Sequence, residues 1–160
     1  MINKIDNSQH QVQFGALKIN KPFKEWNNDV LTATLNSRVI RNIIAKDAKE
    51  GKDTFISFDT DKIENWNFTT NSMLLNVKGA GKDLIFKAKS ITYYVKTGLF
   101  GTGERQALET GSKNLGKDVA DQIKSLDIET FSRKNAIEEI ENLTGKIEVT
   151  EKEVGTDFEA

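Results

Sequence analysis

Three carboxylates in the first half of the chain could bind a divalent cation. Asp59, Asp61 and Glu64 follow one another closely, and carboxylate oxygens are the ligands that Ca²⁺ prefers in proteins. The segment is not an EF-hand loop, because Ile63 and Glu64 stand where that motif requires a ligand and a glycine. A polar turn between two strands explains the same residues, since aspartates accept hydrogen bonds from nearby backbone amides. We expect no metal and no cofactor, and we keep a metal-dependent enzyme that uses the three carboxylates as an alternative.

Two glycine-containing segments could approach an anion through their backbone amides. The segment 79–82 reads Gly-Ala-Gly-Lys and resembles the end of a phosphate-binding P-loop, but Asn76 replaces the leading glycine and Asp83 the metal-binding hydroxyl residue. Alternating apolar residues flank this segment, which favours a hairpin turn. The segment 98–103 lies too far before the next predicted helix for a dinucleotide fingerprint, so we expect a surface loop. Phe100 in that loop either anchors a partner or folds back onto the core.

The residues that support nucleophilic catalysis are scarce in this chain. His10 is the one histidine, and it lies in a polar N-terminal segment without a serine or carboxylate partner visible in the sequence. The chain contains no cysteine, which excludes disulfides, a thiolate nucleophile and a zinc–thiolate site. These observations favour a binding protein over an enzyme.

The candidate binding surface is a sheet face. If the apolar residues that alternate through the segment 73–95 point inward, the opposite face carries Lys78, Lys87, Tyr94 and Lys96. Lysines beside an aromatic side chain are typical of single-stranded nucleic-acid binding. Lysines on the solvated face of an antiparallel sheet are more often a matter of ordinary solubility and edge protection. We take these four residues, together with Phe100, as the candidate binding surface.

Charge is distributed unevenly along the chain, although the formal net charge is only −1. Residues 1–127 hold 19 basic and 15 acidic side chains, whereas residues 128–160 hold 4 basic and 9 acidic ones. A basic sheet face with an acidic C-terminal part would suit a single-stranded nucleic-acid-binding protein whose tail competes with the ligand. This class is therefore an alternative function.

Composition predicts one cytoplasmic domain. A chain of 160 residues with 37% hydrophobic and 29% charged residues can bury a sizeable core. The segment 1–7 lacks the apolar run of a secretory signal, and no stretch reaches the ~18 apolar residues that span a bilayer. Lysine outnumbers arginine and asparagine is plentiful, which suggests a bacterial or phage source.

Apolar periodicity predicts the first elements. Residues 11–19 alternate as a strand, with Val12 and Phe14 on one side. A helix follows over 37–51, where Ser37 caps its start and Gly51 stands at its C-terminal end. Its apolar stripe consists of Val39, Ile40, Ile43, Ile44 and Ala48.

The middle of the chain predicts hairpins. A strand around Ile56 and Phe58 is followed by a polar turn that contains Asp59 and Asp61, and then by a second strand from Trp66. A clear hairpin covers 73–88, with its turn at the glycines of 79–81. The apolar parity shifts by one before residues 91–95, which predicts a bulge at 89–90 and a bend in the sheet.

Two helical stripes and a short strand close the predicted fold. The stripes cover 115–126 and 136–143, Gly145 ends the second helix, and residues 147–149 form a last strand. We therefore predict an α+β fold, in which a bent antiparallel sheet or partial barrel packs with one early helix and two C-terminal helices. Residues 1–150 form the single domain, and residues 151–160 form an acidic, mobile tail.

Part of this pattern resembles a known family. The run 56–66, followed by 74–77 and 84–87, resembles bacterial pleckstrin-homology-like and GRAM-like domains, which show a strand, a short polar turn, a glycine hairpin and a final helix. The early helix and the second C-terminal helix depart from that pattern. The resemblance implies a bent sheet closed by a helix that docks a lipid, a peptide or a protein. A non-catalytic docking domain is therefore the predicted function, with protein or lipid as its partner.

Overall fold

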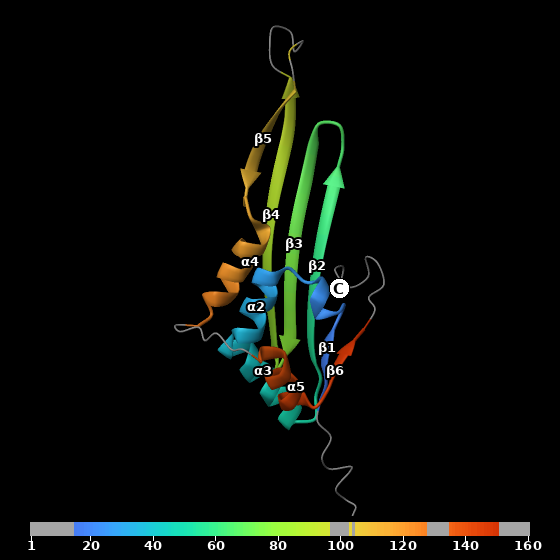
Figure 1. Cartoon of the computed structure of the whole chain (residues 1–160), viewed down its shortest axis with the longest axis vertical. Coiled ribbons are helices and arrows are strands. Elements are labelled where there is room, and N and C mark those ends of the chain that lie inside the picture. The colour runs from blue at the N-terminus through green and yellow to red at the C-terminus, as the bar shows by residue number, and fades with distance from the viewer. Residues whose placement is uncertain (1–14, 97–102, 104, 128–134, 151–160) are drawn as a thin grey trace, which may run out of the picture.

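The chain folds into one long mixed β-sheet whose lower half is covered by helices on one face (Figure 1). The computed structural model describes residues 15–96, 103, 105–127 and 135–150. Within them six strands run in the order β5-β4-β3-β2-β1-β6 and four α-helices pack beside them, which confirms the α+β class. In chain order the elements are β1 (Leu17–Ile19), the 3-10 helix η1 (Phe23–Glu25), α2 (Asn28–Asn36), α3 (Arg38–Lys49), β2 (Thr54–Glu64), β3 (Phe68–Gly79), β4 (Lys82–Lys96), β5 (Arg105–Gly111), α4 (Leu115–Lys124), α5 (Ala136–Thr144) and β6 (Ile147–Val149).

The sheet is open and largely antiparallel, as predicted, and it is mixed because β1 adds parallel pairs at one edge. Strands β2 to β5 are antiparallel neighbours, but Leu17 of β1 pairs in parallel with Thr54 of β2 and with Ile147 of β6. Parallel neighbours need a crossover, and α2 with α3 supplies the one between β1 and β2. Of the strand predicted at 11–19, β1 is observed, while Val12 and Phe14 lie outside the described residues.

Helix α3 forms where the early helix was predicted, and a second helix, α2, precedes it. Ser37 ends α2 and caps α3, because its Oγ accepts a hydrogen bond from the Ile40 amide at 3.2 Å, which confirms the predicted cap. Gly51 follows α3 with φ 73°, as predicted. Asn27 caps α2 by accepting from the Asp29 amide at 2.9 Å. The sparse apolar pattern of α2 hid it in the sequence.

The polar turn predicted at Asp59 and Asp61 is wrong, because β2 continues to Glu64. The chain reverses after that residue, where the Asn65 side chain accepts hydrogen bonds from the Asn67 amide at 3.1 Å and the Phe68 amide at 3.0 Å. This end of β2 is polar on its helix side since no helix covers it. It therefore lacked the apolar alternation by which a half-buried strand is recognised.

The bulge predicted at 89–90 is also wrong. Strand β4 is unbroken, and its pairing with β3 keeps one register from Gly79↔Lys82 to Phe68↔Tyr93. Apolar residues of β4 face the helices at Phe86 and Ala88, and further along the strand they face the other way, as Tyr93 does. The parity shift thus marks the end of the helix layer.

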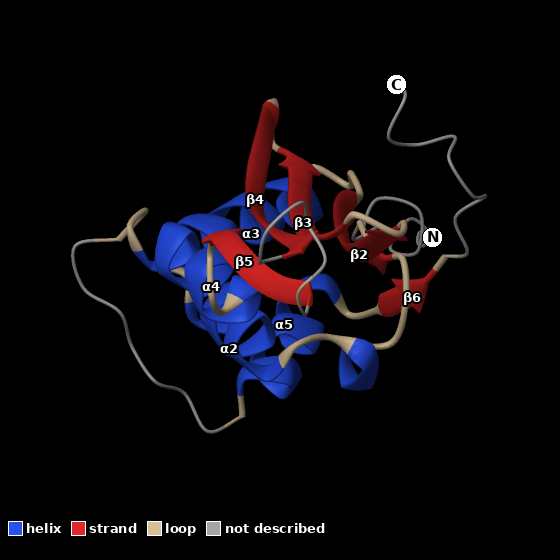
Figure 2. Cartoon of the chain, turned by 90° about the horizontal axis from the view of Figure 1, so that it is seen from above, coloured by secondary structure: helices blue, strands red, loops and turns tan. Residues whose placement is uncertain are grey.

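The hydrophobic core lies between the helices and the lower half of the sheet. Helix-facing side chains of β2, β3 and β4, such as Phe58, Leu75 and Phe86, are buried. Figure 2 shows the helices gathered on one side of the strands, so one sheet face supplies the core. The helices contribute Val30, Leu35, Ile40, Ile43, Ile44, Val119, Ile123 and Ile140.

The C-terminal elements match the prediction. Helices α4 and α5 and strand β6 form where the apolar stripes placed them, and Gly145 ends α5 with φ 71°. Ile140 of α5 is fully buried, so the acidic part of the chain contributes to the core. Residues 151–160 lie outside the described residues. No helix in the described part of the chain is long and apolar enough to cross a bilayer.

Helix α4 is fastened to the edge of β4 by one side-chain amide. Strand β5 pairs with β4 only from Ser90 onward, which leaves the preceding stretch of that edge without a neighbouring strand. There the Gln122 side chain donates to the Lys87 carbonyl at 2.8 Å and accepts from the Lys87 amide at 3.3 Å. Gln122 therefore makes the two hydrogen bonds that a neighbouring strand would make.

Asp53 joins the start of β1 to the start of β2. Its carboxylate accepts from the Ala16 amide at 2.9 Å and pairs with the Lys18 ammonium at 3.1 Å. The bond from the Ala16 amide is the main cause that lowers the pKa of Asp53 below its ordinary value, and Lys18 adds to it. A carboxyl group with a lowered pKa stabilises the fold in its ionised form.

Acidification is therefore expected to destabilise the protein through Asp53. Its contribution is present above the unfolded-state pKa of about 4 and is lost as the pH falls through the lower folded-state pKa. The Asp53→Asn variant should have a free energy of unfolding lower by roughly 0.5–1 kcal/mol at neutral pH, because the pair is partly solvated. Urea unfolding between about pH 7 and pH 3 should show this difference shrinking. A difference that stays constant over that range would contradict the assignment.

Candidate functional site

The upper half of the sheet extends beyond the helix layer and exposes both of its faces. We call this part, residues 60–73, 89–96 and 105–111, the outer half (Figure 1). The other face of the sheet is turned away from the helices, and no described element covers it. This open face consists of the odd-numbered residues of β2 and β4, the even-numbered residues of β3 and β5, Lys18 and Glu148.

Large apolar side chains gather on the open face. Nine are exposed in the described part of the chain, and six of these belong to the open face. Exposed apolar residues that occur singly need no explanation, but a cluster marks an interaction surface. Four of the six lie together in the outer half, where Tyr93 and Leu108 are direct cross-strand partners, and the other two lie nearer the helix-covered end. The six, with their exposed fractions, are Phe55 (50%), Ile63 (54%), Ile85 (57%), Tyr93 (42%), Val95 (38%) and Leu108 (51%).

Charges on the open face are separated by sign. Asp59 and Asp61 lie on β2, Lys87 and Lys89 lie on β4, and β3 runs between the two pairs. Over the whole face four lysines, which also include Lys18 and Lys78, balance four acids, which also include Asp83 and Glu148. The face thus has no net charge, but it is acidic in the middle of β2 and basic in the middle of β4.

The structure divides the predicted binding surface between two faces. Lys78 and Lys87 lie on the open face, but Tyr94 and Lys96 lie on the helix side, because β4 continues without a bulge. The Tyr94 hydroxyl shares a 3.2 Å hydrogen bond with the Thr69 hydroxyl. Phe100 lies outside the described residues. The four described residues therefore cannot contact one flat ligand together.

The three candidate carboxylates are not brought together either. Asp59 and Asp61 belong to the open face, whereas Glu64 lies on the helix side and pairs with the Lys62 ammonium at 2.8 Å. Asp59 accepts a hydrogen bond from the Asn20 side chain at 3.1 Å. Among the residues that the structure describes, no group of three or more His, Cys, Asp or Glu side chains could hold a metal ion.

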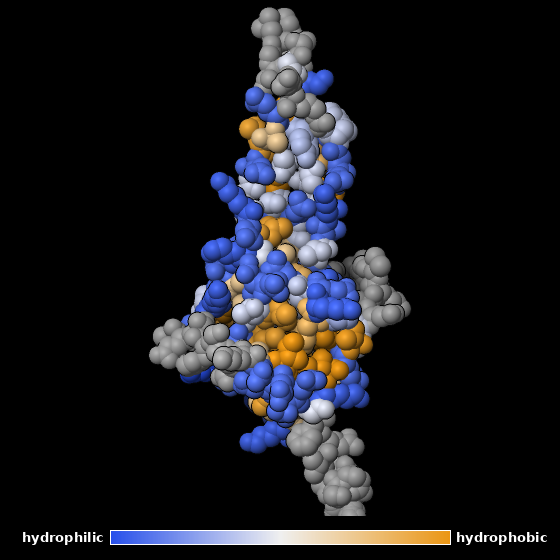
Figure 3. All heavy atoms as spheres, in the orientation of Figure 1, coloured by the Kyte–Doolittle hydropathy of each residue, from blue (hydrophilic) through white to orange (hydrophobic). Residues whose placement is uncertain are grey.

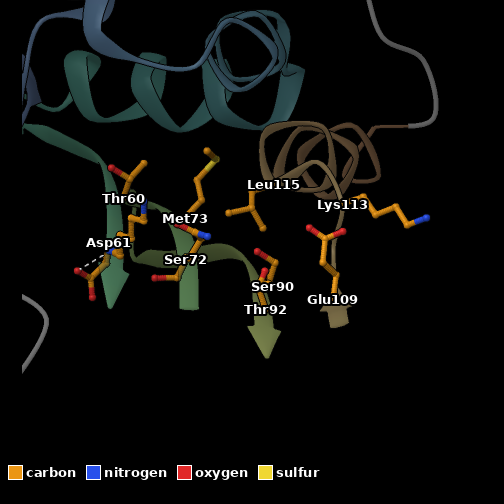
Figure 4. Close-up of a pocket in the computed structure, with 11 residues that line it drawn as sticks. Thr60, Asp61, Ser72, Met73, Ser90, Thr92, Glu109, Lys113 and Leu115 are labelled. Carbon is orange, nitrogen blue, oxygen red and sulfur yellow. Dashed lines mark hydrogen bonds between the residues drawn. The ribbon is translucent and has the colours of Figure 1, made fainter. Parts of the chain in front are cut away.

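A polar hollow of about 680 Å³ lies on the helix side of the outer half, below the start of α4 (Figure 4). Met73 and Leu115 lie next to each other where the sheet meets the helix. Hydroxyl, amide and charged side chains from four strands make up the rest of the wall, which suits hydrogen bonding to a polar molecule. Figure 3 shows this side of the outer half as mostly hydrophilic. The polar side chains that line the hollow include Thr60, Asn71, Ser90, Thr92 and Glu109.

Comparisons with protein-family models, curated proteins and solved structures give no match for this chain. The open face and the hollow are accordingly interpreted from their own geometry.

The apolar residues of the open face were missed in the sequence, although a signal for them exists. Phe55-Ile56 and Ile85-Phe86 are adjacent pairs of large apolar residues within strands. Since neighbouring side chains of a strand point to opposite faces, each pair places one residue in the core and one on the open face. Strands that bury both faces show such runs. The two doublets could have indicated a second apolar face.

Proposed function

We propose that this chain is a non-catalytic binding domain whose open face docks a protein partner. The observation that carries this proposal is the gathering of exposed apolar side chains on the one sheet face that no described helix covers. Transferring such side chains out of water stabilises a complex by ~25 cal/mol per Å² of apolar surface, before the entropic cost of association is subtracted. Aromatic and aliphatic side chains with charged residues toward the edges are the composition of a protein–protein interface.

The charge balance favours a protein over a nucleic acid. Binding to a phosphate backbone depends on an excess of lysine and arginine. The open face has equal numbers of lysines and acids, and Tyr94 and Lys96 are turned to the other side. A lipid partner draws its support from the resemblance to pleckstrin-homology-like domains and from Trp66, which is 82% exposed at the β2–β3 turn. The breadth of the apolar face, from Phe55 to Leu108, supports a protein more strongly.

Site-specific photo-cross-linking tests the proposal. A photoreactive amino acid at Ile63 or Ile85 on the open face is expected to give discrete cross-linked products in the cells from which the chain comes. Ile137 of α5 is the matched control, since it is an exposed isoleucine of the helix layer at 40% exposure. Products should be absent or several-fold weaker from position 137. Equal products from all three positions, or none from positions 63 and 85, would refute docking through the open face.

Two binding assays with the full chain separate the alternative partners. We expect no co-sedimentation with phosphatidylcholine vesicles, with or without phosphatidylserine, and no salt-dependent change in the anisotropy of a labelled single-stranded oligonucleotide. Vesicle binding that disappears in Trp66→Ala would move the proposal to a lipid partner. Oligonucleotide binding that weakens in Lys78→Ala/Lys87→Ala would move it to nucleic acid.

A further inference from the structure

We propose that the partner of the open face is a second copy of this chain, packed face to face about a two-fold axis that runs along β3. This inference rests on the proposed function, because it uses the same face. Its basis is the arrangement of charge across three strands, which is complementary to itself under one symmetry operation and repulsive under the other.

The charges lie in two rows across the sheet. In the first row Leu74 of β3 pairs with Asp59 on one side and Lys87 on the other. In the second row Ser72 separates Asp61 from Lys89 in the same way. Paired residues of neighbouring strands lie on the same face, so each row reads acid, β3 residue, lysine. Lys87 and Lys89 are exposed, and neither forms an ion pair with another described residue.

A two-fold axis parallel to β3, placed above it, superimposes β2 of one copy on β4 of the other. Each Asp59 then faces Lys87 of the second copy, and each Asp61 faces Lys89 of the second copy. Packed sheets lie about 10 Å apart, a spacing that an aspartate and a lysine side chain bridge together. An axis perpendicular to the strands would instead place β2 on β2, where the aspartates repel each other. The charge pattern therefore selects one orientation.

The same operation matches some of the apolar residues of the open face. Ile63 and Ile91 occupy one row, on either side of Thr70, so each Ile63 would face Ile91 of the second copy. Leu74 and Phe68 lie on β3 and would face their own counterparts. Sheet twist separates the strand ends in face-to-face packing, so the contact centres on these rows. Lys78, at the far end of β3, then lies beyond the contact.

The charged side chains of the two rows lie at the lateral edges of the contact, on β2 and β4, while β3 runs along its centre. At their level the sheet is three strands wide, because β1 pairs only with residues 54–56 of β2 and β5 pairs with β4 only from Ser90. The charges therefore stay partly hydrated, which limits the desolvation cost of the ion pairs. Three strands ~4.8 Å apart and about ten residues long project on the order of 500 Å² per chain, or about 1,000 Å² for the pair, which is the lower end of the range for a specific interface.

Sedimentation velocity of the full chain over a range of concentrations tests the inference. The unchanged chain should show a monomer–dimer equilibrium. Lys87→Glu/Lys89→Glu makes both sides of the face acidic, and Asp59→Lys/Asp61→Lys makes both sides basic. Each variant alone should lose dimer affinity by at least ~100-fold, because like charges then oppose each other across the interface. An equimolar mixture of the two variants should recover dimers, since acidic sides then face basic sides.

The controls separate a charge effect from misfolding and from net charge. Lys46→Glu/Lys49→Glu on α3 changes the net charge equally on the helix side, and it should dimerise like the unchanged chain. Circular dichroism should show that each variant is folded. If Asp59→Lys/Asp61→Lys is misfolded, Asp61→Lys alone replaces it in the mixture.

Three results would overturn the two-fold pair: a chain that stays monomeric at all concentrations, a Lys87→Glu/Lys89→Glu variant that dimerises normally, or a mixture that does not associate. A monomeric chain that cross-links from Ile63 to a protein of another mass would overturn this inference and keep the proposed function. A cross-link product at twice the mass of the chain would support both. Failure of all cross-linking from the open face would overturn the proposed function itself.

Discussion

Replacing Asp47 with alanine is expected to lower the free energy of unfolding by about 3 kcal/mol, because one buried and one partly buried donor would lose their acceptor. Asp47 of α3 is 2% exposed. Its carboxylate accepts from the Thr54 hydroxyl at 2.7 Å and from the Ala80 amide at 2.9 and 3.0 Å. The side chain thus connects the helix layer to the start of β2 and to the β3–β4 turn.

The turn depends on this carboxylate because of its backbone geometry. Ala80 has a positive φ of 50°, a conformation that is costly for a residue with a Cβ atom. The bond from its amide to Asp47 supports that conformation. Gly79 allows the close approach, since a Cβ atom there would lie 2.2 Å from the carboxylate. Loss of Asp47 therefore removes the hydrogen bonds from Thr54 and Ala80 and leaves the strained turn without support.

Thermal and urea unfolding would measure the effect of Asp47→Ala. For a domain of this size, a loss of about 3 kcal/mol corresponds to a Tm lowered by roughly 6–12 °C. Asp47→Asn keeps one acceptor and should be less damaging, while Lys46→Ala, an exposed neighbour on α3, should be close to neutral. If Asp47→Ala changed the free energy of unfolding as little as Lys46→Ala, the bracing role would be refuted.

Replacing Phe58 with alanine is expected to lower the free energy of unfolding by about 4 kcal/mol. Phe58 is 2% exposed, and its ring lies 5.6 Å from the Trp26 ring between centroids. The Lys21 ammonium lies over the same ring at 5.1 Å from its centroid. Removing the ring leaves a cavity that these neighbours cannot fill, and the aromatic and cation–π contacts are lost with it.

The matched variant Phe58→Leu separates these contributions. It fills most of the cavity, so it should cost roughly 1–2 kcal/mol, while it abolishes the contacts that need a ring. Urea unfolding followed by Trp26 fluorescence would report both variants, because the indole is buried beside the substituted position. If alanine and leucine were equally destabilising, the ring contacts, and not the cavity, would set the stability at this position.

Local signals in the sequence predicted the parts of the fold that depend on local chemistry. Ser37 caps α3 through its own hydroxyl, and Gly51 and Gly145 adopt positive φ just after helices. These positions depend on hydrogen bonds and backbone angles within a few residues. The parallel pairing of β1 with β2 and β6 joins distant segments, and the sequence carries no comparable signal for it.

The errors in the middle of the chain have a common physical cause. The extent of β2 beyond Phe58 and the parity of β4 after Ala88 both depend on where the helix layer ends. A single sequence does not show which part of a strand a helix will cover. Lys78 and Lys87 lie on one face, as predicted. Tyr94 and Lys96 lie on the other face, because the predicted parity of β4 after Ala88 was wrong.

The attachment of α4 to the sheet through Gln122 bears on how large an assembly can grow. An unpaired strand edge is a template on which further chains can add without limit, as they do in fibrils. Gln122 already occupies the amide and carbonyl of Lys87 on that edge. Growth by strand addition is blocked there, whereas association through a sheet face about a two-fold axis stops at two chains. One glutamine thus disfavours open-ended growth along this edge of the sheet.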